Sequence, residues 1–199
     1  MTQMRELASK LKGVLYLQKD IVLPKALSRR GLTEEKFLQG RLNGANRLSQ
    51  YAVMSALRSS LAALLEHLIG TSKAAKYSNI EGFTKSTRTG NVINRLSDVA
   101  GRIPKSHLSV DLPNWLANEE AHRAACQAEI EIYRHIEKIA ASVSAQRELQ
   151  KAHLLAELSN KHPYLLAFDS RPITLAYLRM LLEELKPGRR ILVATGDTQ

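Results

Sequence analysis

The sequence predicts a mainly α-helical chain whose C-terminal end is a partial α/β, strand-helix-strand segment. Three observations lead to this expectation. Aromatic residues make up only 5% of the 199 residues, which argues against a large β-sandwich or barrel. Leucines recur at helical spacing through much of the chain. Two uninterrupted apolar runs, at residues 164–168 and 191–194, are typical of strands that are covered on both faces.

The N-terminal part is expected to form helices. Residues 2–18 carry apolar side chains close to helical spacing, with Gly13 as a weak point. Glu34 and Glu35 suit the first turn of a second helix, because acidic side chains favour a helix N-terminus.

The clearest helix is expected over residues 43–69, and Gly70 is its expected C-cap. One buried stripe in this segment is formed by leucines 57, 61, 64, 65 and 68. Residues 71–90 are rich in Ser, Thr, Lys, Asn and Gly and contain few large apolar residues. This composition predicts a long basic loop or a partly disordered insert.

The second half predicts two further long helices, one beginning near Asn118 and one ending at His162-Pro163. The strand-helix-strand segment follows, with its helix over residues 173–185. The handedness rule makes this segment a right-handed parallel crossover. Because two parallel strands alone leave unpaired edges, we expect further strands from another polypeptide or from a longer chain.

Charge favours a polyanionic partner. The chain holds 29 Lys and Arg against 19 Asp and Glu, a net charge of +10. Residues 1–110 hold 18 basic and 7 acidic side chains, whereas residues 111–199 hold 11 and 12. A basic half of this kind indicates nucleic acid, with DNA as the first candidate, or a simply solvated basic surface.

No membrane partner is expected, since no stretch approaches the roughly 20 apolar residues that cross a bilayer. The single Cys126 excludes an intramolecular disulfide, so a cytoplasmic location is the expectation. Glu119, His122 and Cys126 share one face of a predicted helix. A zinc site needs about four ligands, so we expect no metal there.

Three C-terminal stretches resemble those of a known family, and they are His162-Pro163-Tyr164-Leu165-Leu166-Ala167-Phe168-Asp169-Ser170-Arg171, Thr174-Leu175-Ala176-Tyr177-Leu178 and Leu192-Val193-Ala194-Thr195-Gly196-Asp197-Thr198. In order and spacing they are similar to the first strand, helix and second strand of the second RecA-like lobe in bacterial helicase-related proteins of superfamily two, close to the Swi/Snf type. Residues 56–65 resemble the helix between the two lobes, although Leu61 stands where a proline is common.

The resemblance implies that residues 1–160 form a basic, helical inter-lobe region and residues 161–199 an incomplete helicase C-terminal RecA-like lobe. The complete family protein is an ATP- and Mg²⁺-dependent helicase or translocase. This chain has no Gly-Lys pair for a phosphate loop, and no Asp is followed by Asp or Glu. We therefore expect no catalytic residue, no cofactor and no ATP hydrolysis in this chain alone, with the missing lobes as partners.

The candidate nucleic-acid-binding residues are Ser170, Arg171, Lys85, Arg88 and Arg95. The first two follow the first predicted strand, at the sheet edge where α/β proteins bind ligands. The other three could track phosphates. The alternatives are that Ser170 only caps a helix and that the basic side chains are solvated. The alternative function is a stand-alone basic helical protein that binds nucleic acid or acts as a scaffold.

Overall fold

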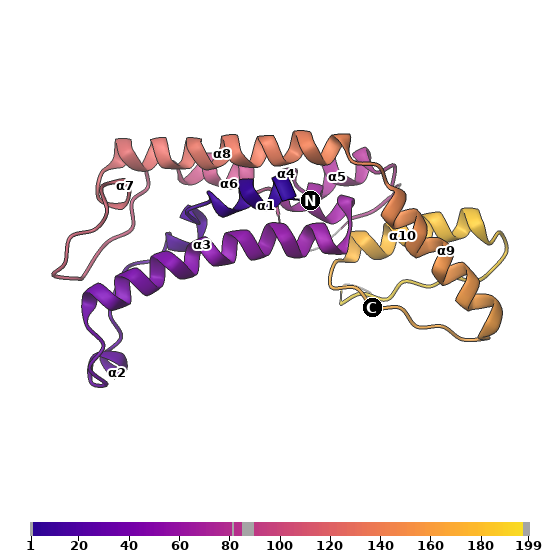
Figure 1. Cartoon of the computed structure of the whole chain (residues 1–199), viewed down its shortest axis with the longest axis horizontal. Coiled ribbons are helices and arrows are strands. Elements are labelled where there is room, and N and C mark those ends of the chain that lie inside the picture. Colours follow the sequence, from indigo (N-terminus) through magenta and orange to yellow (C-terminus); the bar gives the residue numbers. More distant parts are fainter. Residues whose placement is uncertain (1, 81, 85–89, 197–199) are drawn as a thin grey trace. The chain divides into compact units, whose positions relative to one another are not determined.

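The structure is a computed structural model that describes residues 2–80, 82–84 and 90–196 (Figure 1). These ranges form helices joined by turns and loops, and an isolated bridge joins Ile21 to Ser106. No strand occurs in them. The mainly α prediction is confirmed for the described residues. None of their helices is long and apolar enough to pass through a bilayer.

The chain divides into two compact units. Unit 1 comprises Met1–Met54 and Val92–Ile136, and unit 2 comprises Ser55–Asn91 and Glu137–Gln199. The boundary predicted at residue 160 lies inside unit 2, so the compact units divide the chain differently from the predicted domains.

Unit 1 is built around the first part of α3 (Glu34–Ser59) and most of α8 (Glu119–Ser142). Its shorter helices are α1 (Thr2–Ser9), η1 (Val14–Leu17), α2 (Lys25–Ser28), α6 (Val92–Val99) and α7 (Asn114–Ala117). One of its apolar clusters has as buried members Leu17, Ile21, Leu38, Ala45 and Leu116. The helix predicted over residues 2–18 is in fact two helices, because the chain turns at Gly13.

Unit 2 contains α4 (Leu61–Ile69), α5 (Thr71–Tyr77), α9 (Gln146–Lys161) and α10 (Pro172–Leu185). Helix α10 packs along α9 and also contacts α4. Ala152 of α9 meets Leu178 and Leu181 of α10 in a small apolar cluster. The helix predicted at residues 173–185 is therefore present and is docked within this unit.

The helix predicted over residues 43–69 is interrupted at Ser60. Ser60 has an extended backbone (φ −163°, ψ 167°), and its hydroxyl accepts the N–H of Ala63 at 3.0 Å. This is an N-cap, which begins α4 as a separate helix. Gly70 ends α4 with a φ of +89°, as predicted for a C-cap.

The segment that was predicted as a loop begins with a helix. Ala74 and Ala75 of α5 are buried, and α5 packs against α4. Small residues allow this close packing without a large apolar stripe, so helical periodicity does not reveal it. Lys85 and Arg88 of the predicted basic loop lie outside the described residues.

The two predicted strands do not form in the described chain. Residues 164–168 and 191–194 have no ladder partner. Tyr164, Leu166, Phe168 and Leu192 are 93%, 84%, 90% and 75% exposed, whereas covered strands would bury them. The physical reason is that a strand needs neighbours for its N–H and C=O groups, and no described segment supplies them.

Candidate functional site

The site begins where the first apolar run leads into α10. Arg171 is the N-cap residue of α10, and Pro172 occupies its first turn. The Asp169 carboxylate accepts the Arg171 backbone N–H at 2.8 Å. A carboxylate that binds the N–H two residues ahead shapes a tight turn. Asp169, rather than Ser170, therefore organises the start of α10.

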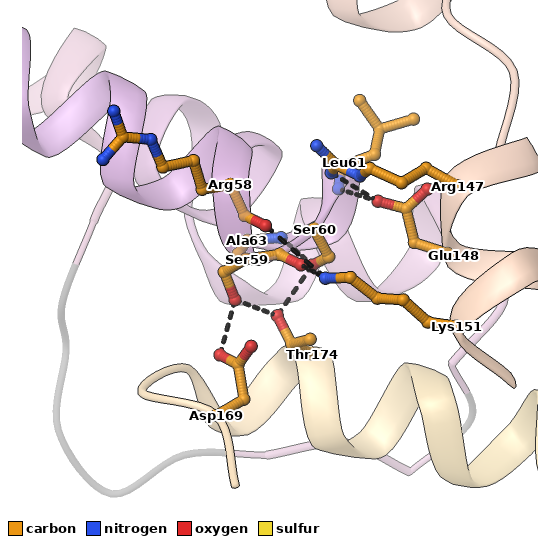
Figure 2. Close-up of polar contacts among 10 residues, drawn as sticks. All are labelled: Arg58, Ser59, Ser60, Leu61, Ala63, Arg147, Glu148, Lys151, Asp169 and Thr174. Carbon is orange, nitrogen blue, oxygen red and sulfur yellow. Dashed lines mark hydrogen bonds and ion pairs between the residues drawn. The ribbon is translucent and has the colours of Figure 1, made fainter. Parts of the chain in front are cut away.

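A chain of hydroxyl groups links this turn to the junction between α3 and α4 (Figure 2). Ser59 donates to Asp169 at 2.5 Å, and its oxygen lies 2.6 Å from that of Thr174. The Ser60 oxygen lies 2.7 Å from the same Thr174 oxygen. These four residues, Ser59, Ser60, Asp169 and Thr174, are called the hydroxyl chain below.

The direction of each hydrogen bond in the hydroxyl chain follows from the Asp169 carboxylate at one end, which can only accept. A hydroxyl has one proton to donate, and Ser59 gives its proton to the Asp169 carboxylate. Thr174 must therefore donate to Ser59, and Ser60 must donate to Thr174. Every hydroxyl proton is thus committed to a hydrogen bond, and the Asp169 carboxylate that Ser59 contacts also accepts the Arg171 backbone N–H. The arrangement fixes the backbone at this junction.

Two side chains of α9 complete the junction. Lys151 donates from Nζ to the Ser59 carbonyl at 2.6 Å, at the C-terminal end of α3. The Glu148 carboxylate accepts the Leu61 backbone N–H at 3.0 Å, at the start of α4. A cation at a helix C-terminus and an anion at an N-terminus each oppose the partial charge of the helix end. Helix α9 therefore holds both helix ends together (Figure 2).

Glu148 is 2% exposed, and its buried negative charge is compensated by Arg147, whose guanidinium donates to the carboxylate at 2.7 Å. The three hydroxyl side chains of the hydroxyl chain are also buried, with Ser59 at 7% and Ser60 and Thr174 at 0% exposure, and Asp169 is half-buried. Buried polar groups are stable only when hydrogen-bonded, and these are. The junction is thus a rigid support for the turn beside it.

The predicted site residues fall in different places. Ser170 is exposed and Arg171 is half-buried, and no hydrogen bond or ion pair of the described chain engages the Arg171 guanidinium. Arg95 is exposed on α6 in unit 1, whereas Ser170 and Arg171 belong to unit 2. Lys85 and Arg88 lie outside the described residues. Ser170 and Arg171 are neighbours in the sequence and lie in the same unit.

Sequence reasoning missed the residues that support this turn. A hydroxyl pair, Ser59-Ser60, interrupts an apolar stripe, and a buried Thr174 follows Pro172 by two residues. Small hydroxyl residues inside an apolar pattern are a usable signal, because a buried hydroxyl must find a partner. The pattern does not reveal which residues those partners are.

The charge of the two units differs from the charge of the two sequence halves. Unit 1 holds 15 Lys and Arg and 10 Asp and Glu, and unit 2 holds 14 and 9. Each unit therefore has a net charge of +5. The basic excess of residues 1–110 is shared by both units, because each unit combines segments from both parts of the sequence.

His122 and Cys126 form a buried pair on α8, with Sγ 3.7 Å from the His122 Nδ1. The Gly101 backbone N–H donates to the same nitrogen at 3.1 Å. Burial lowers the pKa of His122 and raises the pKa of the Cys126 thiol to about 11. In the part of the chain that the structure describes, no three His, Cys, Asp or Glu residues gather as metal ligands.

Comparison of the chain with family models, curated proteins and solved structures gives no match. The resemblance to helicase-related proteins thus rests on the residues quoted for it. The function must be inferred from the contacts, exposure and charge of the chain itself.

Proposed function

We propose that this chain is part of a helicase-like, nucleic-acid-dependent ATPase or translocase, to which it contributes nucleic-acid contact but no ATP-hydrolysing residue. The observation that carries the proposal is the state of the two apolar runs beside α10. Residues 164–168 are all exposed, with Tyr164 and Leu166 at 93% and 84% and Leu165 at 38%. Leu192 is likewise exposed between the half-buried Ile191 and Val193.

In the second run exposure alternates with period two, as in a strand with one covered face. Large apolar side chains left in water along both runs favour a further layer or further strands that cover them. The two runs flank α10 in the order of the predicted strand-helix-strand segment. This supports an incomplete RecA-like lobe that would be completed by strands outside the described residues, on the same polypeptide or on another one.

The nucleic-acid contact is assigned to Ser170 and Arg171. They follow the first run directly, and the hydroxyl chain and Asp169 fix the backbone that carries them. An unpaired guanidinium at this position suits a charge-assisted hydrogen bond to a phosphate. ATP and Mg²⁺ would be held by the missing lobes, and the complete protein would act in the cytoplasm.

A stand-alone helical binding protein is the second candidate. It is favoured by the docking of α10 within unit 2, where Leu178 and Leu181 pack on Ala152. Sequencing the full transcript separates the two candidates. Phosphate-loop and arginine-finger motifs in the same or a neighbouring reading frame would support the helicase-like protein, and their absence would favour the stand-alone protein.

The nucleic-acid contact is tested by fluorescence anisotropy with labelled duplex and single-stranded DNA at two salt concentrations. Affinity should fall as salt rises, because phosphate contacts release counterions. Arg171→Ala should weaken binding. Arg179→Ala is the matched control, since it removes the same charge from α10 where Glu183 already pairs with Arg179 at 2.7 Å. Absent or salt-independent binding, or equal effects of the two variants, would overturn the assignment.

A further inference from the structure

We infer that the exposed face of α3 in unit 1 binds the backbone of single-stranded nucleic acid, with Lys36 and Arg47 on phosphates and Tyr51 stacked on a base. The inference rests on the proposed nucleic-acid contact and adds a second, separate surface to it. This surface, called the α3 face below, consists of Lys36, Gly40, Asn43, Gly44, Arg47 and Tyr51.

Helical spacing places these six residues together. They follow one another at intervals of three or four positions, or as the adjacent pair 43 and 44, which keeps them on one side of an α-helix. Five of the six are exposed and Gly44 is half-buried. The opposite side of α3 is buried, as Leu38, Ala45 and Val53 show. The α3 face is therefore a solvent-facing stripe.

The charge of this stripe favours an anionic partner. After the first turn of α3, no Asp or Glu occurs from Lys36 to Leu65. Some exposed cations on other helices are paired within the chain, as in Arg134–Glu131 and Lys161–Glu157. No hydrogen bond or ion pair of the described chain engages the Lys36 ammonium or the Arg47 guanidinium. Both cations are free to meet phosphates.

Tyr51 adds an aromatic ring at one end of this basic stripe. Its side chain is 64% exposed and lies one turn after Arg47, and Leu48 beside it is 50% exposed. An exposed ring beside a basic stripe is the combination by which proteins hold single strands, since bases stack on the ring and phosphates meet the cations. Bases within a duplex are not available for such stacking.

The two glycines permit a close approach. A Cβ at Gly40 or Gly44 would meet nothing within 4 Å, so packing inside the chain does not require glycine at either position. Glycine inside a helix costs about 0.5–1 kcal/mol relative to alanine. The span from Lys36 to Arg47 is about 16 Å of helix axis. A strand with the spacing of B-form DNA places about five phosphates along such a length.

The test measures the affinity of the full chain for short fluorescent oligo(dT) over a series of salt concentrations. Arg47→Ala should weaken binding and reduce the slope of log affinity against log salt by about 0.7, the contribution of one phosphate contact on a single strand. Tyr51→Ala should weaken binding about fivefold or more, because stacking on that base is lost. Tyr51→Phe keeps the ring and should bind like the wild type.

Matched controls separate this surface from general charge and folding effects. Arg134→Ala removes one charge from α8 in the same unit, and Tyr77→Ala removes a tyrosine that is 50% exposed on α5. Neither should change the affinity or the salt slope. Circular dichroism checks that each variant keeps its helices.

The outcomes distinguish failure of the α3 face from failure of the proposed function. If Arg171→Ala weakens binding but Arg47→Ala and Tyr51→Ala do not, the α3 face is excluded and the proposed function stands. If the wild-type chain binds no nucleic acid, both fall. The inference would also be overturned if Arg47→Ala and Arg134→Ala reduced the affinity equally. Tight binding of a duplex that Tyr51→Ala leaves unchanged would overturn it as well.

Discussion

The backbone N–H of Gly13 donates to the carboxylate of Glu129 at 2.5 Å, although 116 positions separate the two residues. Gly13 is the N-cap of η1 and has no side chain with which to cap it. The buried Glu129 carboxylate, from α8, instead satisfies the Gly13 N–H just before η1. Gly13 also has a φ of +83°, and a Cβ there would lie 2.2 Å from the Ala45 carbonyl oxygen. Glycine is thus required by both conformation and space.

Gly13→Ala should lower the free energy of unfolding by about 2 kcal/mol or more, since it adds left-handed strain and a backbone clash. Urea denaturation followed by circular dichroism measures this. Gly31→Ala is the control, because Gly31 has a φ of +80° but open space around its Cα. It should cost only about 1 kcal/mol, the strain alone. Equal losses in the two variants would show that the Ala45 contact relaxes.

The charge on Glu129 predicts a pH dependence. Burial raises the pKa of Glu129 above its usual value of 4.5, despite backbone N–H donors that oppose the rise. The folded chain therefore favours the protonated carboxyl. This contribution to stability is fully present below pH 4.5 and is lost as pH rises through the raised pKa.

Glu129→Gln keeps an acceptor for Gly13 and cannot ionise. Relative to the wild type, its free energy of unfolding should therefore increase as pH rises from about 4 towards 8. Denaturation of both proteins across this range gives the difference. A constant difference would mean that Glu129 has the same pKa folded and unfolded, and a decreasing one would mean that its N–H donors outweigh burial.

Local patterns in the sequence were enough to find the long helices of this fold. Helices α8, α9 and α10 were predicted, and so was the end of α4 at Gly70. Gly13 was recognised as a weak point, but its partner Glu129 was not, because a buried carboxylate looks like any other helical Glu. Helix α5 was missed since alanines bury it without an apolar stripe.

The candidate site was predicted only in the part formed by residues that are close in the sequence. Ser170 and Arg171 stand out beside an apolar run, whereas Ser59 reaches Asp169 across 110 positions. Such a contact depends on tertiary packing, and no periodic pattern in the sequence indicates it. The strand prediction used local composition alone, and strands also require neighbours that the described chain does not supply.

Thr174→Val should destabilise unit 2 by about 1–3 kcal/mol, because it keeps the shape of the side chain but leaves Ser60 without an acceptor and Ser59 without its donor. Thr174→Ser retains the hydroxyl and loses one methyl, so it should cost less. Urea denaturation followed by circular dichroism compares them. If the serine variant is the less stable of the two, methyl packing matters more than the hydroxyl chain.

Gly40→Ala and Gly44→Ala should each raise the free energy of unfolding by about 0.4–1 kcal/mol, because alanine favours the helix and restricts the unfolded chain. Both added methyl groups enter open space. Urea denaturation measures the gain, and a loss would contradict the open surroundings of either position. If a nucleic-acid strand approaches the α3 face closely, the double variant should bind oligo(dT) more weakly while it unfolds at higher urea. A gain in stability with unchanged binding would show that these glycines are not needed for the approach.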